Sequence, residues 1–335
     1  MGSNSSLLAS AWPPVRTMGR KAVEAGLRRI PFSVLEPLRQ AFPLSEPGSL
    51  QDRVQRRILA FLRHRGLPPD TEFFTLQDNP EISIEVCDSF IAVWLYWCGE
   101  KKGYEPEVLR WWKEFCKTST NVLELGANIG YFTVQGAKTN SSAKYTAVEP
   151  HPGAARICRK NLDRNGISSV QVVEAAAVST AQQPEIDLFL PGGRDHYDEA
   201  PCSGFAGGNE VHQEGTENIS AYNSIRVAAV ELRELIAGVD LLKIDVEGQE
   251  HQLLTSVDDQ IRSSRPTMFL EVLPGTPRLR SWIAGLCSEL DYRCFVPTSE
   301  ALIPLSAEEL SGVSLVDRFG TRDLVVTCRA IPNQA

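Results

Sequence analysis

The chain has 335 residues, of which 42% are apolar, and it carries a net charge of −8. This length and composition allow a large buried core, organised as one large domain or two smaller ones. The longest unbroken apolar stretch, Phe90 to Cys98, is nine residues, which is too short to cross a bilayer, and the N-terminus lacks the apolar segment of a signal peptide. We therefore expect a soluble, cytoplasmic protein without a transmembrane segment.

The first 70 residues are basic and form a region of their own. They contain eleven Lys or Arg against five Asp or Glu, a balance of +6, which leaves 23 against 37, or −14, for residues 71–335. The segment Gln51 to Arg65 places its apolar residues on one stripe, and Ser49 with Asp52 forms a capping box, so we predict an amphipathic helix. This helical region, residues 1–70, either packs on the rest of the chain or contacts a membrane surface or a protein partner.

Charge and cysteine spacing argue against two classes of ligand. A nucleic-acid substrate requires Lys and Arg clustered near the active site, because its phosphates must be neutralised. The acidic remainder has the opposite balance, and we expect no nucleic-acid partner. The eight cysteines form no C-x-x-C pair and lie mostly in apolar runs, which predicts reduced core thiols rather than disulfides or a zinc site.

Alternating elements define the fold class. Thr71 to Val86 is predicted as two strands around the turn Asp78-Asn79-Pro80, and Pro106 to Cys116 as a helix. From Asn121 onward strands and helices alternate, which indicates an α/β fold with a mostly parallel sheet covered on both faces. The seven strands that we predict are Val122–Leu125, Tyr145–Val148, Val170–Glu174, Leu241–Ile244, Met268–Val272, Arg293–Val296 and Leu324–Cys328.

The first motif is N-V-L-E-L-G-A-N-I-G-Y at residues 121–131, which predicts a strand, a glycine-bearing turn and the start of a helix. Gly126 and Gly130 permit close approach of the backbone to a ligand. Glu149, at the tip of the next strand, suits the diol of a ribose. The arrangement is typical of a loop that binds a nucleotide-type cofactor.

The residues of this loop distinguish between cofactors. A dinucleotide loop has the pattern G-x-G-x-x-G, but Asn128 and Tyr131 replace its second and third glycines. Glu124 would repel a phosphate and attract a cationic ammonium or sulfonium group. We therefore predict that the cofactor is S-adenosylmethionine.

An insertion separates the third and fourth predicted strands of the sheet. Ile186 to Leu190 and Ile225 to Val230 alternate in polarity and are predicted to pair as an antiparallel ribbon. The stretch between them, residues 191–224, lacks apolar periodicity. Loops of this length are usually functional or disordered, so this one is either a disordered connection or a lid over the acceptor. The polar candidates in such a lid are His196, Tyr197 and His212.

The second motif is L-L-K-I-D-V-E-G-Q-E at residues 241–250. It again places a polar tip after an apolar strand and before a helix. Open α/β sheets bind ligands at the carboxyl ends of their strands, and Asp245 and Glu247 fall at that position.

Taken together, the motifs E-L-G-A-N-I-G, V-E-P-H-P and L-L-K-I-D-V-E-G-Q-E, with G-Y-E-P-E at residues 103–107, resemble the FkbM-type methyltransferases. The resemblance covers roughly Thr71 to Cys328. It implies a Rossmann-like class I methyltransferase fold, with a seven-stranded sheet whose last two strands form an antiparallel edge hairpin. It also implies transfer of a methyl group to a hydroxyl oxygen of a small molecule or sugar. We accordingly assign residues 71–335 to a methyltransferase domain and residues 191–224 to an inserted acceptor loop.

Two other functions are compatible with parts of the pattern. A nucleotide-cofactor oxidoreductase would use the same strand, turn and helix, but the missing glycines argue against it. A non-catalytic module that binds S-adenosylmethionine would not need the acids of the second motif.

The predicted chemistry requires a base near the acceptor oxygen, because an alcohol must lose its proton as it accepts the methyl group. The candidates are Asp245, Glu247 and Glu271. We favour Asp245 because it directly follows a buried strand. The same three acids could form an oxygen-rich site for magnesium, but Asp-x-Glu at a strand tip is too common a pair to indicate one, and we assign no metal. The predicted cofactor-binding residues are Glu124, Gly126, Asn128, Gly130, Glu149, Pro150, Ala176 and Asp245.

Overall fold

The structure is a computed structural model, and it describes residues 30–41, 66–191, 205–206, 222–312 and 314–332. The predicted helix Gln51–Arg65 lies outside the described residues. So does most of the inserted segment, including His196, Tyr197 and His212.

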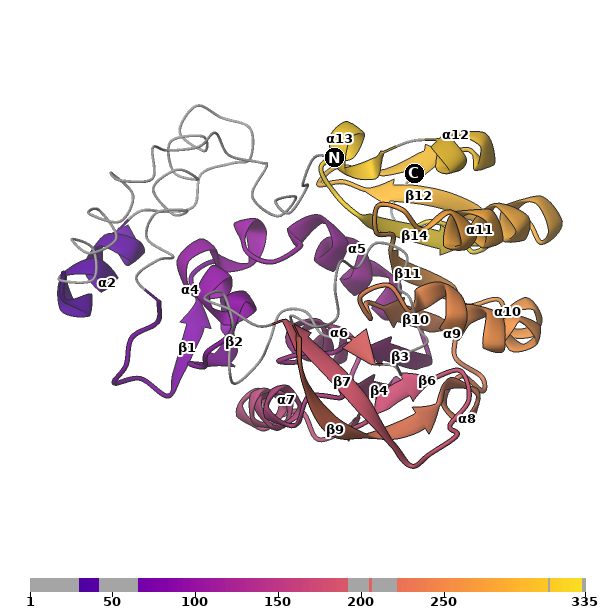
Figure 1. Ribbon diagram of the computed structural model, residues 1–335. Coiled ribbons are helices and arrows are strands. Elements are labelled where there is room, and N and C mark those ends of the chain that lie inside the picture. The colour runs from indigo at the N-terminus through magenta and orange to yellow at the C-terminus, as the bar shows by residue number, and fades with distance from the viewer. Residues whose placement is uncertain (1–29, 42–65, 192–204, 207–221, 313, 333–335) are drawn as a thin grey trace, which may run out of the picture.

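A mixed, mostly parallel sheet forms the centre of the molecule (Figure 1), and it contains all seven predicted strands, with ends that differ by no more than one residue. Strands β3, β4, β5, β10 and β11 run parallel; β14 pairs antiparallel with β11, and β12 pairs antiparallel with β14. The order across the sheet is β13-β12-β14-β11-β10-β3-β4-β5. The bounds are β3 Asn121–Leu125, β4 Lys144–Val148, β5 Val170–Val173, β10 Leu241–Ile244, β11 Thr267–Glu271, β12 Arg293–Pro297, β13 Leu302–Leu305 and β14 Asp323–Thr327.

The sheet therefore has eight strands, one more than the seven predicted. The additional strand is β13, which pairs antiparallel with β12. Pro304 concealed it in the sequence, because proline removes a backbone donor and argues against a strand interior. The structure places β13 at the edge of the sheet, where a missing donor is tolerated. The last two predicted strands, β12 and β14, pair antiparallel as expected. They do not form the edge of the sheet, because β13 lies outside β12.

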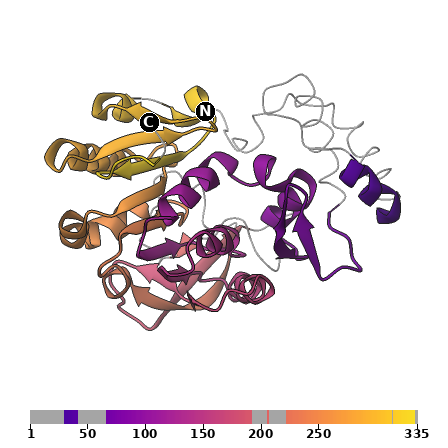
Figure 2. The ribbon, with the colours of Figure 1, turned by 180° about the vertical axis from the view of Figure 1, so that it is seen from behind.

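Helices cover both faces of the sheet (Figures 1 and 2) because side chains alternate along each strand. On β10, Leu241 belongs to one hydrophobic core and Leu242 and Ile244 to the other. The first face is covered by α4 Phe90–Lys102, α5 Pro106–Cys116, α6 Tyr131–Thr139 and α7 Pro152–Arg164. The second is covered by α8 Leu232–Leu235, α9 Glu250–Ser256, α10 Asp258–Ser264, α11 Pro277–Glu289, α12 Ala307–Gly312 and α13 Leu315–Phe319.

Two smaller sheets complete the described fold. The two strands predicted within Thr71 to Val86 are present as β1 Phe73–Leu76 and β2 Asn79–Glu85, but the turn was misplaced: it lies at residues 77–78, and Asn79 and Pro80 begin β2. The predicted ribbon is also confirmed, since β7 Glu185–Pro191 pairs antiparallel with β9 Tyr222–Glu231. With β6 Ala176–Val178 and β8 Phe205–Ala206 they form a four-stranded sheet in the order β6-β9-β7-β8.

One helix of the N-terminal region is described, α2 Phe32–Ala41, and it packs on α4. Arg39 donates to the backbone oxygen of Tyr96 at 3.0 Å and stacks over its ring, and the Tyr96 hydroxyl donates to Glu36. The ring of Phe32 stacks on that of Trp97 with centroids 6.3 Å apart. This part of residues 1–70 therefore contacts the body of the protein.

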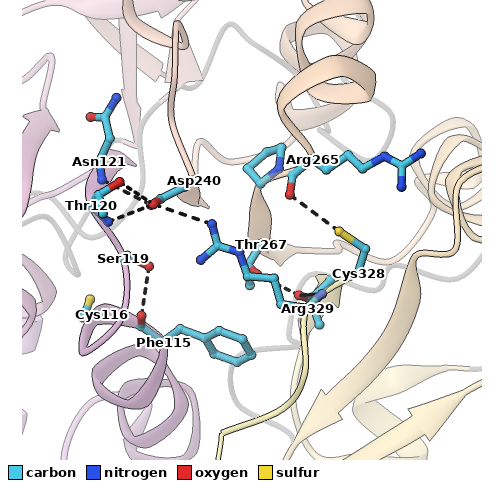
Figure 3. Close-up of polar contacts among 12 residues, drawn as sticks. Phe115, Cys116, Ser119, Thr120, Asn121, Asp240, Arg265, Thr267, Cys328 and Arg329 are labelled. Carbon is cyan, nitrogen blue, oxygen red and sulfur yellow. Dashed lines mark hydrogen bonds and ion pairs between the residues drawn. The ribbon is translucent and has the colours of Figure 1, made fainter.

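A polar network fastens the amino ends of the parallel strands (Figure 3). Asp240, the residue before β10, accepts hydrogen bonds from the backbone N–H and the hydroxyl of Thr120 at 2.8 and 2.7 Å, and from the N–H of Asn121 at 3.2 Å. The guanidinium of Arg329 lies 3.6 Å from the same carboxylate. No helix among the described residues is long and apolar enough to cross a membrane.

Candidate active site

The loop of residues 126–130, which we call the donor loop, joins β3 to α6. Its Gly126 and Gly130 have φ of +82° and +77°, and Asn128 has φ of +50°, a region that favours glycine and tolerates asparagine. A Cβ on Gly126 would lie 1.9 Å from the carbonyl oxygen of Asp245. Glycine is therefore required there because the ends of the two sequence motifs pack against each other.

Glu149 ties the donor loop to the end of β4. Its Oε2 accepts the backbone N–H of Asn128 at 2.7 Å, and its Oε1 accepts that of His151 at 2.8 Å. The residue is buried, and burial raises the pKa of Glu149 to about 7. Each carboxylate oxygen can accept a second hydrogen bond, so both remain available to a ligand hydroxyl.

Glu124 is buried at the end of β3. Its Oε2 accepts the hydroxyls of Tyr145 at 2.5 Å and Thr133 at 2.8 Å. Burial raises the pKa of Glu124, although the charge of Lys243 opposes the shift. The first motif thus supplies an acid that is fixed by two hydroxyls before any ligand binds.

A pocket opens over these residues, and its walls come from segments far apart in the chain. Ile91 and Tyr104 contribute from the α4–α5 region, and Leu188 and Leu190 from the ribbon strand β7. Each predicted cofactor residue lines it except Gly130, whose Cβ position would lie 2.5 Å from the sulfur of Cys158 on α7. The lining residues predicted from the sequence are Glu124, Gly126, Asn128, Glu149, Pro150, Ala176, Asp245 and Glu247.

Ile91 and the two leucines of the lining carry no signal in the sequence that would have assigned them to the site, whereas Gln249 lies within the second motif. Tyr104 does carry one, since it lies in the G-Y-E-P-E segment. Two buried polar atoms of lining residues have no hydrogen-bond partner among the described residues: the amide nitrogen Nε2 of Gln249 and the hydroxyl of Tyr131. Such atoms are costly unless a ligand or water pairs them.

Lys243 and Asp245 form an ion pair beside the pocket. The ammonium of Lys243 lies 3.0 Å from Oδ2 of Asp245 and 4.8 Å above the ring of Phe132. Burial lowers the pKa of Lys243, but the carboxylates around it, Asp245 first, outweigh this effect and raise it above the ordinary value. The lysine is therefore charged and holds Asp245 in place.

The turn after β10 is tightly wound and involves two acids, Glu247 and Glu250. Glu247 has φ of +54° and Gly248 φ of +97°. Oε1 of Glu250 accepts the backbone N–H of Val246 and of Gly248, both at 3.2 Å, which stabilises the turn. Burial and the charge of Asp245 raise the pKa of Glu247 to about 8. A left-handed conformation at a non-glycine residue is costly and clusters at functional sites.

Glu271 ends β11 and does not line the pocket. Its Oε1 lies 3.4 Å from the guanidinium of Arg322, and burial followed by the charge of Asp245 raises its pKa well above the ordinary value. No group of three or more His, Cys, Asp or Glu side chains in the described ranges is placed to hold a metal ion.

Comparison with known proteins gives related sequences and folds. The sequence matches the methyltransferase FkbM domain family over residues 124–294. Methyltransferase sdnD of Sordaria araneosa is 27% identical over 159 residues, which cover 42% of this chain and 61% of that protein. A tRNA (guanine-N(7)-)-methyltransferase of Vibrio cholerae serotype O1 is 24% identical over 146 residues, 42% of this chain and 54% of that protein. The chain thus spans less than two thirds of the length of these curated relatives.

Among solved structures, methyltransferase FkbM from Methylobacillus flagellatus KT matches with a TM-score of 0.37 and 14% identity, covering 62% of this chain and 43% of that chain. The family match begins at Glu124 and includes Asp245, Glu247 and Glu271. Glu105 and Asp323 lie outside the matched range.

Proposed function

The chain belongs to the methyltransferase FkbM domain family, and on that premise we propose that it is an S-adenosylmethionine-dependent O-methyltransferase that acts on a hydroxyl of a small molecule or sugar. The observation that carries the proposal is the convergence of both sequence motifs on one pocket. The donor loop supplies one wall, and the turn after β10 brings the acids to the same opening.

The residues of the pocket fit this cofactor. Glu149 would accept hydrogen bonds from the ribose hydroxyls. The leucines of β7, with Val148 and Ala176, offer apolar walls for the adenine ring. The unpaired donors of Gln249 and Tyr131 suit polar groups at the other end of the molecule. When bound, S-adenosylmethionine supplies an activated methyl group. The chain has to align the acceptor oxygen with it, exclude water and take up the acceptor's proton.

Glu247 is the better of the two pocket acids for taking up that proton. Asp245 is engaged by the ammonium of Lys243 at 3.0 Å, so its carboxylate is already occupied by an ion pair. Glu247 has a pKa of about 8, and a base is most effective when its pKa lies near the working pH. We therefore assign proton transfer to Glu247, in place of the expectation from sequence, and assign to Asp245 the alignment of the acceptor.

The acceptor that we propose is not a nucleic acid, although one relative acts on tRNA by name. The acceptor side of the pocket presents Asp245 and Glu247, and Glu271 lies close to both. These carboxylates would repel a phosphate backbone. In the part of the chain that the structure describes, Lys243 is the only lysine or arginine that lines the pocket, and Asp245 already pairs with it.

The extent of the domain follows from the same proposal. We assign methyl transfer to residues 71–335, with residues 191–224 as the acceptor loop, because the described strand β7 that leads into this segment lines the pocket. Residues 1–70 include α2, whose packing on α4 supports a structural role. A membrane or protein contact by the rest of that region, and a cytoplasmic location, stay predictions.

The proposal is tested by ligand binding followed by methyl transfer. Calorimetry of the full chain should show binding of S-adenosylmethionine and S-adenosylhomocysteine and none of NAD⁺. Transfer of a labelled methyl group should then be measured on a panel of sugars and small alcohols beside total tRNA. Binding of NAD⁺ alone would support the oxidoreductase, and labelling of tRNA alone would disprove the small-molecule acceptor.

A further inference from the structure

Three carboxylates occupy one level of the central sheet, and we call them the carboxylate row: Asp245, Glu271 and Asp323. The register of β11 and β14 places Glu271 directly opposite Asp323. Ile244 of β10 pairs with Leu270 of β11, so Asp245 and Glu271, the next residues, come level. Side chains at one level of adjacent strands point to the same face. Like charges in this arrangement are destabilising, so their presence calls for a functional reason.

A fourth carboxylate covers the row from the α4–α5 connection. Glu105 adopts a left-handed backbone conformation, with φ of +44° and ψ of +53°. Burial and the charge of Asp323 raise the pKa of Glu105 well above its ordinary value. Asp245, at one end of the row, lines the cofactor pocket, as does Tyr104, the neighbour of Glu105, so the row begins at the pocket.

The acids of this region are incompletely paired. The Oε2 atoms of Glu105, Glu250 and Glu271 are buried and have no hydrogen-bond partner among the described residues. Glu250 is only 1% exposed. Its charge contributes to the raised pKa of Glu247 and of Glu271. Two cations lie among these acids. Lys243 pairs with Asp245, and its charge also opposes the raised pKa of Glu105 and of Asp323, while Arg322 pairs with Glu271. The region is thus short of cationic donors.

We propose that the carboxylate row and Glu105 bind a positively charged amine of the acceptor, beside the hydroxyl that is methylated. The inference rests on the proposed function and narrows its substrate class to amino alcohols, such as amino sugars. An ammonium group donates three hydrogen bonds in different directions, which matches unpaired oxygens contributed by separate elements.

The amine belongs to the acceptor rather than to the donor because of the direction of the row. From β10 it runs through β11 to β14, whereas the donor loop and Glu149 follow β3 and β4 on the other side of β10 (Figure 1). A metal ion is the weaker choice of cation. Its oxygen ligands must converge to within about 2.6 Å of one point, and no described group of acids does so.

The test uses the full chain saturated with S-adenosylhomocysteine at pH 8, and it measures the thermal midpoint with 2-aminoethanol, ethylene glycol or MgCl₂ at equal ionic strength. We expect 2-aminoethanol to raise the midpoint by about 2 °C and ethylene glycol to have no effect. Glu271→Gln and Asp323→Asn should each abolish the rise. Glu300→Gln, a matched change at an exposed turn, should retain it.

Each outcome decides between defined alternatives. Three results would overturn the amine proposal. These are stabilisation by MgCl₂ alone, no response to 2-aminoethanol, and a response to 2-aminoethanol that persists in both Glu271→Gln and Asp323→Asn. The effect of S-adenosylhomocysteine by itself is recorded first. If it does not stabilise the protein, the proposed function fails; if it does and 2-aminoethanol does not, only the amine assignment fails.

Discussion

Strand β10 carries an aspartate at each end, and the two are held in different ways. Asp240, at the amino end, accepts three hydrogen bonds from Thr120 and Asn121 and faces Arg329 (Figure 3). Asp245, at the carboxyl end, is paired with Lys243 and lies level with Glu271. At the amino edge Asp240 is matched with donors, while the carboxyl edge holds more carboxylates than the two cations, Lys243 and Arg322, that pair with them.

This difference indicates which edge serves stability and which serves function. Paired carboxylates stabilise the native state, whereas buried acids with raised pKa values are typical of binding and catalytic sites. The pKa is raised to about 7 for Glu149 and Glu250 and to about 8 for Glu247, in each case chiefly by burial. The following predictions would break or sharpen the contrast between the two edges.

The largest effect is expected at Glu247. Glu247→Gln should lower kcat/KM by roughly 10² to 10⁴, the usual cost of losing a general base, with little change in the affinity for S-adenosylhomocysteine. The wild-type rate should rise with pH up to about 8, following the pKa of Glu247, and the variant should lose this rise. If the pH dependence survives in Glu247→Gln and disappears in Asp245→Asn, then Asp245 is the base.

The next effect is on donor binding. Glu149→Ala removes the proposed ribose acceptor and releases the N–H groups of Asn128 and His151. We expect a loss of about 1.5 to 3 kcal/mol in the binding free energy of S-adenosylhomocysteine, measured by calorimetry on folded protein. Glu174→Ala, at an exposed ion pair with Arg159 just after β5, is the matched control and should bind normally. Equal affinity of the two variants would refute the assignment of Glu149.

At the opposite edge, stability and function should separate. Asp240→Ala leaves Thr120 and Asn121 without their acceptor, and it should lower the free energy of unfolding by on the order of 1.5 to 3 kcal/mol. The affinity for S-adenosylhomocysteine should not change. Urea denaturation of Asp240→Ala beside Glu247→Gln provides the measurement. A Glu247→Gln protein that is destabilised as much as Asp240→Ala would show that the two edges do not differ in the way described.

The smallest effect is the pH dependence of stability. The pKa values of Glu149, Glu250 and Glu247 are higher in the folded protein than the ordinary value of 4.5, so the folded state binds more protons at intermediate pH. Their contribution to stability is complete below pH 4.5 and is lost as the pH rises through about 7 to 8. The thermal midpoint of the ligand-free protein should therefore fall over this range. In Glu247→Gln the thermal midpoint should fall by about 2 °C less as the pH approaches 8. A thermal midpoint with the same pH profile as the wild type would argue against the raised pKa of Glu247.

Local patterns were sufficient for much of the fold and for the donor side of the site. Alternation of strands and helices from Asn121 onward predicts the parallel sheet, and the seven strands are found where expected. The two motifs placed Glu149 and Asp245 at strand ends, and both line the pocket. These features are readable because burial on both faces and glycine turns leave a signal within ten residues of sequence.

Other parts of the structure depend on which strands become neighbours. Strand β14 runs antiparallel between β12 and β11, so Asp323, at the start of its strand, reaches the edge where parallel strands end. A search of carboxyl strand ends therefore misses it. Glu105 approaches the same edge from a connection between helices more than a hundred residues from Asp245. The tertiary structure alone decides that these acids meet, because sheet order and strand direction are set by packing across the whole core and not by the residues adjacent in the chain.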